Sequence, residues 1–120
     1  MDVQSAESFL LPSKGSVVLR TGLAFAVPAG YEMQVRSRSG LAAKHGVFVT
    51  NGPGTIDCDY RDELMVILTN AGKKGFQINV GDRIAQLVFA PVFGPRLLLC
   101  EALPLAQGRV GGLGSTGGFG

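Results

Sequence analysis

The sequence has 120 residues, a mass of 12.5 kDa and a formal net charge of +2, and a chain of this size is expected to form one domain. Its Lys and Arg residues are dispersed along the sequence, which argues against a dedicated nucleic-acid binder. Charged residues make up only 17% of the chain, against roughly a quarter in ordinary domains, so part of the surface is expected to be covered by other subunits.

Strand signals dominate the chain. Apolar and polar residues alternate at 31–35 and 76–80, and short apolar runs occur at 16–19, 23–27, 46–50, 64–68, 85–92 and 96–100. Turn residues separate these runs at 28–30, 51–54, 70–75 and 80–82. The segment 39–46 has room for only one or two helical turns. Many short strands separated by turns predict an all-β sandwich, as a jelly roll or distorted barrel.

The C-terminal segment 108–120 differs from the rest, since seven of its thirteen residues are glycine. One interpretation is a flexible terminus that cannot form a core. The other is a flap that closes over a phosphate-bearing ligand, because glycine lets backbone amides approach closely. The residues alone favour the flexible terminus. In either case we divide the chain into a domain at 1–107, expected to be a jelly roll, and a glycine-rich C-terminal segment at 108–120, which is the flap of the second interpretation.

Cys58, Cys100 and the single histidine, His45, lack the spacing of a metal site, and we expect two reduced thiols rather than a disulfide. The N-terminal segment carries Asp2 and Glu7 and no early Lys or Arg, so no signal peptide is predicted. No apolar run reaches membrane-spanning length. A soluble, cytoplasmic protein is therefore expected.

Arg36, Arg38, Ser39 and Gly40 directly follow a predicted strand. Guanidinium groups match phosphate oxygens, a serine hydroxyl can donate to them, and glycine leaves its amide accessible. A helical turn starting at Gly40 would add a favourable dipole for an anion. The alternative is a helix capped by Ser39 beside two solvated arginines, and these residues alone leave both interpretations open.

Three acids, Asp57, Asp59 and Asp62, crowd the segment before an apolar strand. One of them, Asp57, could act as a general base that takes a proton from an attacking water. Tyr60 could stack on a sugar or a base. The alternative is a hairpin whose Asp side chains satisfy their own turn, and this segment in isolation favours that alternative.

Arg83 and Gln86 are the polar members of the segment 81–92. Gln86 lies within an apolar run, and a buried amide costs free energy unless its hydrogen bonds are met. A ligand and a protein partner explain it equally well.

Taken together and in this order, the segments closely resemble the trimeric deoxyuridine triphosphatases (dUTPases). RSGLAAKHG (38–46) resembles the second motif of that family, and NGPGTIDCDYRDEL (51–64) the third. GDRIAQLVF (81–89) resembles the fourth motif and GGLGSTG (111–117) the glycine-rich fifth, while MDVQSA (1–6) resembles the end of the first.

The resemblance implies a jelly roll that assembles as a homotrimer with active sites at the subunit interfaces. It implies hydrolysis of dUTP to dUMP and pyrophosphate, which keeps uracil out of DNA and supplies dUMP for dTMP synthesis. Asp57 matches the acid that activates the water attacking the α-phosphorus. Tyr60 matches the aromatic under the deoxyribose, and Asn51 begins the hairpin whose backbone reads uracil.

Arg38, Ser39, Gly40 and Gln86 match the phosphate contacts of the family. Asp2 matches an acid that helps to hold Mg²⁺ through water, while the substrate triphosphate binds most of the metal. The other substrate contacts that the resemblance implies are Gly54, Thr55, Ile56, Met65, Arg109, Leu113, Gly114 and Ser115.

Three positions depart from the family pattern: Leu113 replaces a usual Phe, Arg109 follows a glycine instead of preceding it, and Asp62 replaces a usual Gly. The irregular fifth motif and the short first motif leave a second function open, a catalytically weak dUTPase-like regulatory trimer that binds nucleotide. Deoxycytidine triphosphate deaminase shares the fold, but it would need a glutamate-centred site in place of the hairpin at 56–60.

Overall fold

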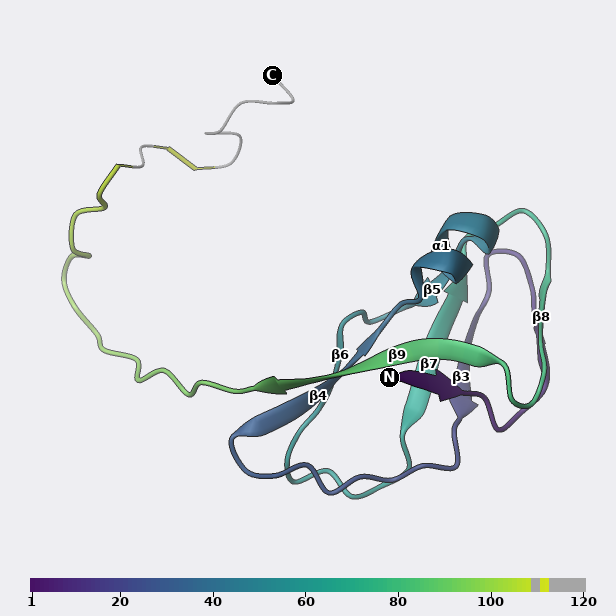
Figure 1. Ribbon diagram of the computed structural model, residues 1–120. Helices are drawn as coiled ribbons and strands as arrows, with labels where there is room; N and C mark the ends of the chain where they lie inside the picture. Colours follow the sequence, from purple (N-terminus) through teal and green to yellow (C-terminus); the bar gives the residue numbers. More distant parts are fainter. Residues whose placement is uncertain (109–110, 113–120) are drawn as a thin grey trace.

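The computed structural model describes residues 1–108 and 111–112, whose strands form three antiparallel sheets (Figure 1). The four-stranded sheet has the order β1 (Asp2–Gln4), β9 (Arg83–Pro91), β4 (Tyr31–Arg36) and β6 (Gly54–Ile56). The three-stranded sheet has the order β3 (Ser16–Arg20), β7 (Met65–Asn70) and β5 (Val47–Val49), and β2 (Phe9–Leu11) pairs with β8 (Phe76–Ile78). The predicted all-β class is confirmed, as open sheets rather than a closed barrel in the described residues.

The core is built by strand alternation, in which every second side chain points inward. Met33 and Val35 are buried in β4 while Glu32 and Gln34 are half-buried, which confirms the predicted alternation for 32–35, whereas Tyr31, predicted on the same face as Met33, is 43% exposed. The buried apolar side chains come from all three sheets and, at Val27 and Leu64, from segments outside the strands: Val3, Leu11, Leu19, Val27, Met33, Val35, Val47, Val49, Leu64, Val66, Leu68, Ile78, Ile84, Ala85 and Leu87.

Helix α1 (Ser39–His45) is seven residues long, which fits the one or two turns predicted for this segment. Its N-cap residue is Arg38, which is extended and makes no side-chain cap hydrogen bond, so the alternative in which Ser39 caps the helix is wrong. Gly46 ends the helix in the left-handed conformation, at a φ of 68°. No helix in the described part of the chain is long and apolar enough to cross a membrane.

The apolar run at 23–27 was predicted to be a strand, and this prediction is wrong. Val27 is buried and Phe25 packs against the core, but the segment pairs with no strand. An apolar run indicates that its side chains are buried, but it does not show that the segment is a strand. An irregular segment can bury side chains without the backbone hydrogen bonds of a sheet. Conversely, β1 and β2 were not predicted, because each has only three residues and lies outside the longer apolar or alternating runs of the sequence.

The chain leaves the sheets after β9 and continues as an extended arm (Figure 1). The strand predicted at 96–100 is wrong for the described single chain, because no strand edge lies beside it. Leu97, Leu98 and Leu99 are 92%, 74% and 106% exposed. Of the predicted flap at 108–120, the structure describes only Gly108, Gly111 and Gly112.

Candidate active site

Strand register brings residues from distant parts of the chain together in the four-stranded sheet. The pairing of β1 with β9 places Asp2 opposite Gln86, and the pairing of β9 with β4 places Gln86 opposite Arg36. The Gln86 Nε2 group donates a hydrogen bond of 3.3 Å to Asp2 Oδ1. Gln86 is exposed, so the expectation of a buried amide is wrong: residues of a strand alternate between two faces, and Gln86 lies on the outer one.

Two arginines complete this group. Arg38 Nε lies 3.9 Å from Asp2 Oδ1, and Arg83 Nη1 lies 3.5 Å from Asp2 Oδ2. Arg38 also donates a hydrogen bond of 3.0 Å from Nη1 to the backbone carbonyl of Arg83. We call Asp2, Arg38, Arg83 and Gln86 the Asp2 corner. Because it holds two guanidinium groups and one carboxylate, positive charge is in excess.

The Arg38 side chain has unused hydrogen-bonding capacity. Its Nε is buried and has no hydrogen-bond partner among the described residues. An unsatisfied buried donor costs about 1–3 kcal/mol, so an added acceptor such as a phosphate oxygen would be favourable there. A hollow of about 270 Å³ opens beside the corner, lined by Arg38, Leu41, Phe76, Asp82, Arg83 and Ile84.

The turn that begins at Asn51 leads into β6, which pairs with β4 on the side opposite β9. Gly54 lies opposite Val35, and Ile56 lies opposite Met33. Gly54 is buried, and a Cβ atom at this position would lie 3.3 Å from both Asn51 Nδ2 and Val35 Cβ. Glycine at position 54 therefore lets β6 and the turn before it lie close to β4.

Asp57 directly follows β6, and its side chain is exposed. Its carbonyl accepts a hydrogen bond of 3.2 Å from the Tyr60 N–H, which closes a tight turn. The Tyr60 hydroxyl donates a hydrogen bond of 2.8 Å to the Glu63 carbonyl. Arg61 donates from Nη1 to the carbonyls of Cys58 and Tyr60, at 2.7 and 3.0 Å. The acceptors of all these hydrogen bonds are backbone carbonyls. The exposed Asp57 carboxylate is therefore not needed to hold the turn, and it is accessible to a ligand or a water molecule.

Glu63 anchors the end of the segment that carries Asp57 and Tyr60, and this role was not predicted from the sequence. Its carboxylate accepts hydrogen bonds from the Gly22 N–H at 2.8 Å and from Arg20 Nε at 3.0 Å. The Gly22 hydrogen bond, followed by that from Arg20, lowers the pKa of Glu63. Its partners lie 41 and 43 residues earlier in the chain, so no local pattern points to this role.

Asp59 and Asp62 are exposed. Asp62 stands where the related family usually has glycine, yet Lys14 is the only described residue other than glycine with a positive φ. The backbone at position 62 therefore accepts an aspartate without strain.

The single chain does not bring Asp57 to the Asp2 corner. Register places Asp57 one position beyond Ile56, and therefore level with Glu32, whereas Gln86 is level with Arg36. Four residues along a strand span roughly 13 Å, and the two inter-strand spacings from β6 through β4 to β9 add roughly 10 Å across the sheet. The two groups therefore lie at different ends of the sheet.

The remaining predicted site residues are dispersed over several places. Ser39 and Gly40 are exposed in the first turn of α1, next to Arg38. Thr55 is exposed in β6, and Met65 is 45% exposed at the start of β7. Four predicted contacts lie outside the described residues: Arg109, Leu113, Gly114 and Ser115.

Within the described residues, no three His, Cys, Asp or Glu side chains gather as a metal site. The Asp2 carboxylate is the acid of the corner, and its contacts of 3.3 to 3.9 Å are long. Its oxygens therefore have capacity left for water. Such a donor set fits Mg²⁺ held through water, and does not fit a metal bound by protein side chains alone. Cys58 and Cys100 are both free thiols, as predicted.

Comparisons with known proteins agree on one family. A family model described as dUTPase matches residues 1–117. The deoxyuridine 5'-triphosphate nucleotidohydrolase of Zymomonas mobilis is 50% identical over 119 residues, which are 98% of this chain and 80% of that protein.

Solved structures of phage dUTPases share the fold. A point mutant of the dUTPase of Staphylococcus bacteriophage 80alpha, solved with dUpNHpp, has a TM-score of 0.87 at 26% identity, covering 97% of this chain and 84% of that chain. A point mutant of the dUTPase from phage phi11 of S. aureus, described with a structural Mg(II) ion, has a TM-score of 0.78 at 27% identity, covering 85% of this chain and 82% of that chain.

Proposed function

The chain belongs to the dUTPase family, and on that premise we propose that it hydrolyses dUTP to dUMP and pyrophosphate by attack of water on the α-phosphorus. The observation that carries the proposal is the Asp2 corner. There, three family motifs that are far apart in the sequence contribute Asp2, Arg38 and Gln86 to one group with excess positive charge. This reaction would keep uracil out of DNA and supply dUMP for dTMP synthesis.

The Asp2 corner binds the triphosphate. Arg38 provides forked donors that match phosphate oxygens, and its unpartnered Nε favours an added acceptor. Gln86 adds an amide donor from β9, and Ser39 and Gly40 add a hydroxyl and an accessible amide from the neighbouring turn of α1. Binding of the phosphates at several points positions the α-phosphorus for in-line displacement.

Asp57 orients the attacking water and accepts its proton. The carboxylate is exposed beside a turn that uses only backbone carbonyls, so it is available to a water molecule. Tyr60 supports the deoxyribose, where its ring would leave no room for a ribose 2′-hydroxyl. The hairpin from Asn51 through Gly54, Thr55 and Ile56 reads uracil, and Met65 lies at the start of the strand that follows it.

Magnesium would neutralise the charge of the triphosphate, which is the chemistry that the ion supplies when bound. Asp2 would hold it through water, since one carboxylate with long contacts to its neighbours suits an ion that keeps most of its water. The protein's own contribution is to position the phosphates with Arg38 and Gln86 and to hold Asp57 at the water.

The active site is shared between subunits of a homotrimer. The separation of Asp57 and the Asp2 corner within one chain supports this proposal, since a site that uses both groups can take them from two copies. The exposed leucines of the arm support association, because contiguous exposed apolar side chains mark interaction surfaces. In the same proposal, the flap at 108–120 closes over the bound nucleotide, with Arg109, Leu113, Gly114 and Ser115 as its contacts, and the enzyme acts in the cytoplasm.

The test is release of pyrophosphate from each deoxynucleoside triphosphate in the presence of Mg²⁺. We expect release from dUTP and not from dTTP, dCTP, dATP or dGTP. Release of ammonia from dCTP would instead identify a deaminase. Tight binding of dUTP without hydrolysis would identify the catalytically weak regulatory trimer.

A further inference from the structure

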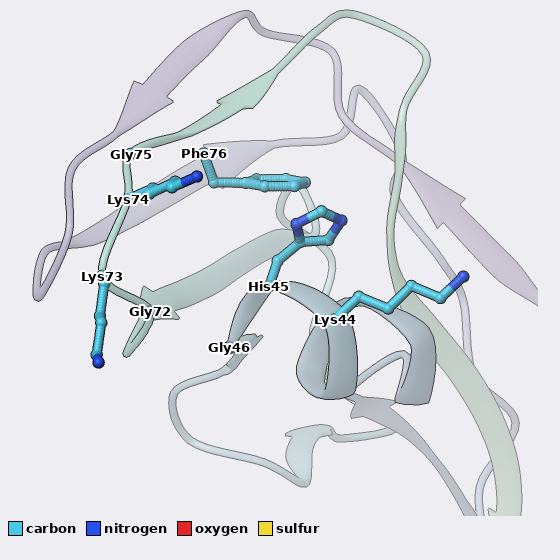
Figure 2. Close-up of a pocket in the computed structure, with 8 residues that line it drawn as sticks. All are labelled: Lys44, His45, Gly46, Gly72, Lys73, Lys74, Gly75 and Phe76. Carbon is cyan, nitrogen blue, oxygen red and sulfur yellow. The ribbon is translucent and has the colours of Figure 1, made fainter.

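The four lysines of the chain, which are dispersed in the sequence, gather in one region of the fold. Lys44, Lys73 and Lys74 line a hollow of about 590 Å³ (Figure 2). Lys14 lies next to it, since its Nζ donates a hydrogen bond of 2.6 Å to the Ala71 carbonyl, in the same loop. The lysines, although dispersed in the sequence, therefore lie near one another in the fold.

No carboxylate balances this charge. The lining of the hollow contains no Asp or Glu, and the sequence has no acid at 33–56 or 64–81. Every ion pair of the described residues uses an arginine, at Arg20, Arg38 or Arg83. The lysines therefore form a region of uncompensated positive charge.

The dipole of helix α1 accounts for only one of the lysines that line the hollow. Lys44 and His45 lie in the last turn of α1, where positive charge is favourable to the helix dipole. Lys73 and Lys74 belong to the loop between β7 and β8 and have no such role. These two lysines therefore add positive charge that the helix dipole does not explain.

The backbone beneath the lysines is closely packed. A Cβ atom on Gly72 would lie 2.5 Å from the His45 carbonyl oxygen, and one on Gly46 would lie 2.9 Å from the Gly72 nitrogen. The side chain of Asn70, which is fully buried, ties the loop together: Nδ2 donates to the Lys74 carbonyl at 2.8 Å and Oδ1 accepts from the Gly72 N–H at 2.9 Å. The loop is therefore held in place.

Figure 2 shows how the side chains are arranged around this floor. The ring of His45 lies next to the ring of Phe76, with 4.8 Å between the centroids and an angle of 50° between the ring planes. Lys74 extends towards Phe76, whereas Lys44 and Lys73 point away on different sides. Their long stems allow the ammonium groups to turn towards an anion seated in the hollow.

We propose that this hollow, which we call the lysine hollow, binds oligophosphate groups, meaning two or more linked phosphates. Its volume lies within the roughly 300–1,000 Å³ typical of small-ligand sites. Three lysines around one concavity match a compact ligand that carries several negative charges. A nucleic-acid strand would instead need a basic stripe along its length.

The lysine hollow is separate from the Asp2 corner and does not depend on the proposed reaction. The corner lies at the start of α1 and the lysine hollow at its end, roughly 10 Å away for a helix of this length. Phe76 lines both the lysine hollow and the smaller hollow beside the corner.

The experiment is an amide NMR titration of the full chain with inorganic tripolyphosphate, in EDTA and in an Arg38→Gln background that weakens the Asp2 corner. We expect saturable shifts of Gly72, Lys73, Lys74 and Gly75. The double variant Lys73→Gln/Lys74→Gln should weaken binding about fivefold per lysine, which corresponds to about 1 kcal/mol for each unit charge in water. The charge reversal Lys74→Glu should abolish it.

The matched control is Arg96→Gln, which removes one positive charge from the exposed arm and should leave the titration unchanged. Titration with ATP separates two sources of the ligand: tighter binding than tripolyphosphate assigns the site to a nucleotide, and equal binding assigns it to free oligophosphate. The proposal is overturned if tripolyphosphate leaves these amides unshifted, if Arg96→Gln weakens binding as much as the lysine variants, or if only a thymidine oligonucleotide shifts them.

Discussion

The Tyr60 hydroxyl donates a hydrogen bond of 2.8 Å to the Glu63 carbonyl, and the Glu63 carboxylate is itself bound by the Gly22 N–H at 2.8 Å. The turn that carries Asp57 is thereby tied to the end of β3 through two successive contacts. A turn that presents a carboxylate to a substrate needs such an anchor, because displacements of about 1 Å from the productive geometry can reduce rates about 10²-fold.

We expect Tyr60→Phe to lower the free energy of unfolding by about 1 kcal/mol, because one hydrogen bond is lost while the ring remains. Thermal or urea unfolding measures this. The matched control is Tyr31→Phe, since Tyr31 stacks on Phe89 with a centroid distance of 4.9 Å and its hydroxyl makes no hydrogen bond within the described residues. Equal effects of the two substitutions would contradict the anchoring role.

Asp57→Asn should reduce kcat for dUTP by about 10²-fold or more, because the amide cannot accept the proton of the attacking water. Binding of a non-hydrolysable dUTP analogue should be retained. The control is Asp59→Asn, which removes an exposed carboxylate two positions away and should leave kcat near that of the unmodified enzyme. Near-normal turnover of Asp57→Asn would reject Asp57 as the base.

Arg38→Gln should weaken binding of the analogue by about tenfold or more, since a hydrogen bond to a charged group contributes about 1.5–3 kcal/mol. Arg38→Lys should recover only part of this loss, because lysine keeps the charge and lacks the planar fork. Calorimetric titration of both variants gives the comparison, with Arg96→Gln as the variant that changes charge away from the corner. Full recovery in Arg38→Lys would show that charge alone matters.

Subunits of Asp57→Asn and Arg38→Gln, each impaired on its own, should regain activity when they are unfolded together and refolded as a mixture. A site shared by two copies can then take Asp57 from one variant and Arg38 from the other. Activity should follow the mixing ratio and peak near equal amounts, and sedimentation of the unmodified protein should give a trimer. A mixture that is no more active than its components would contradict the shared site.

Glu63 should make stability depend on pH in the acidic range. Its pKa in the folded protein lies below the ordinary value of 4.5, so its contribution is fully present above that value and is lost as pH falls through the folded pKa. The difference in Tm between the unmodified protein and Glu63→Gln should therefore be larger at neutral pH than in strong acid. Glu101→Gln, in the exposed arm, provides the control, and a pH-independent difference for Glu63→Gln would refute the linkage.

Features that depend on residues close together in the sequence could be predicted from the sequence alone. Alternation predicted the inward residues Met33 and Val35 of β4, and the turn residues at 51–54 predicted the turn before β6, because both depend on neighbours along the chain. The order of the motifs identified the family, and with it the roles proposed for Asp57, Arg38 and Gln86.

Only the tertiary structure decided what depends on register between distant segments. It placed Gln86 on an exposed face beside Asp2, left the runs at 23–27 and 96–100 outside the sheets, and joined Glu63 to Gly22. It also gathered lysines that the sequence disperses. The physical reason is that backbone pairing and charge act over a few ångströms in space, whatever the number of residues between the partners.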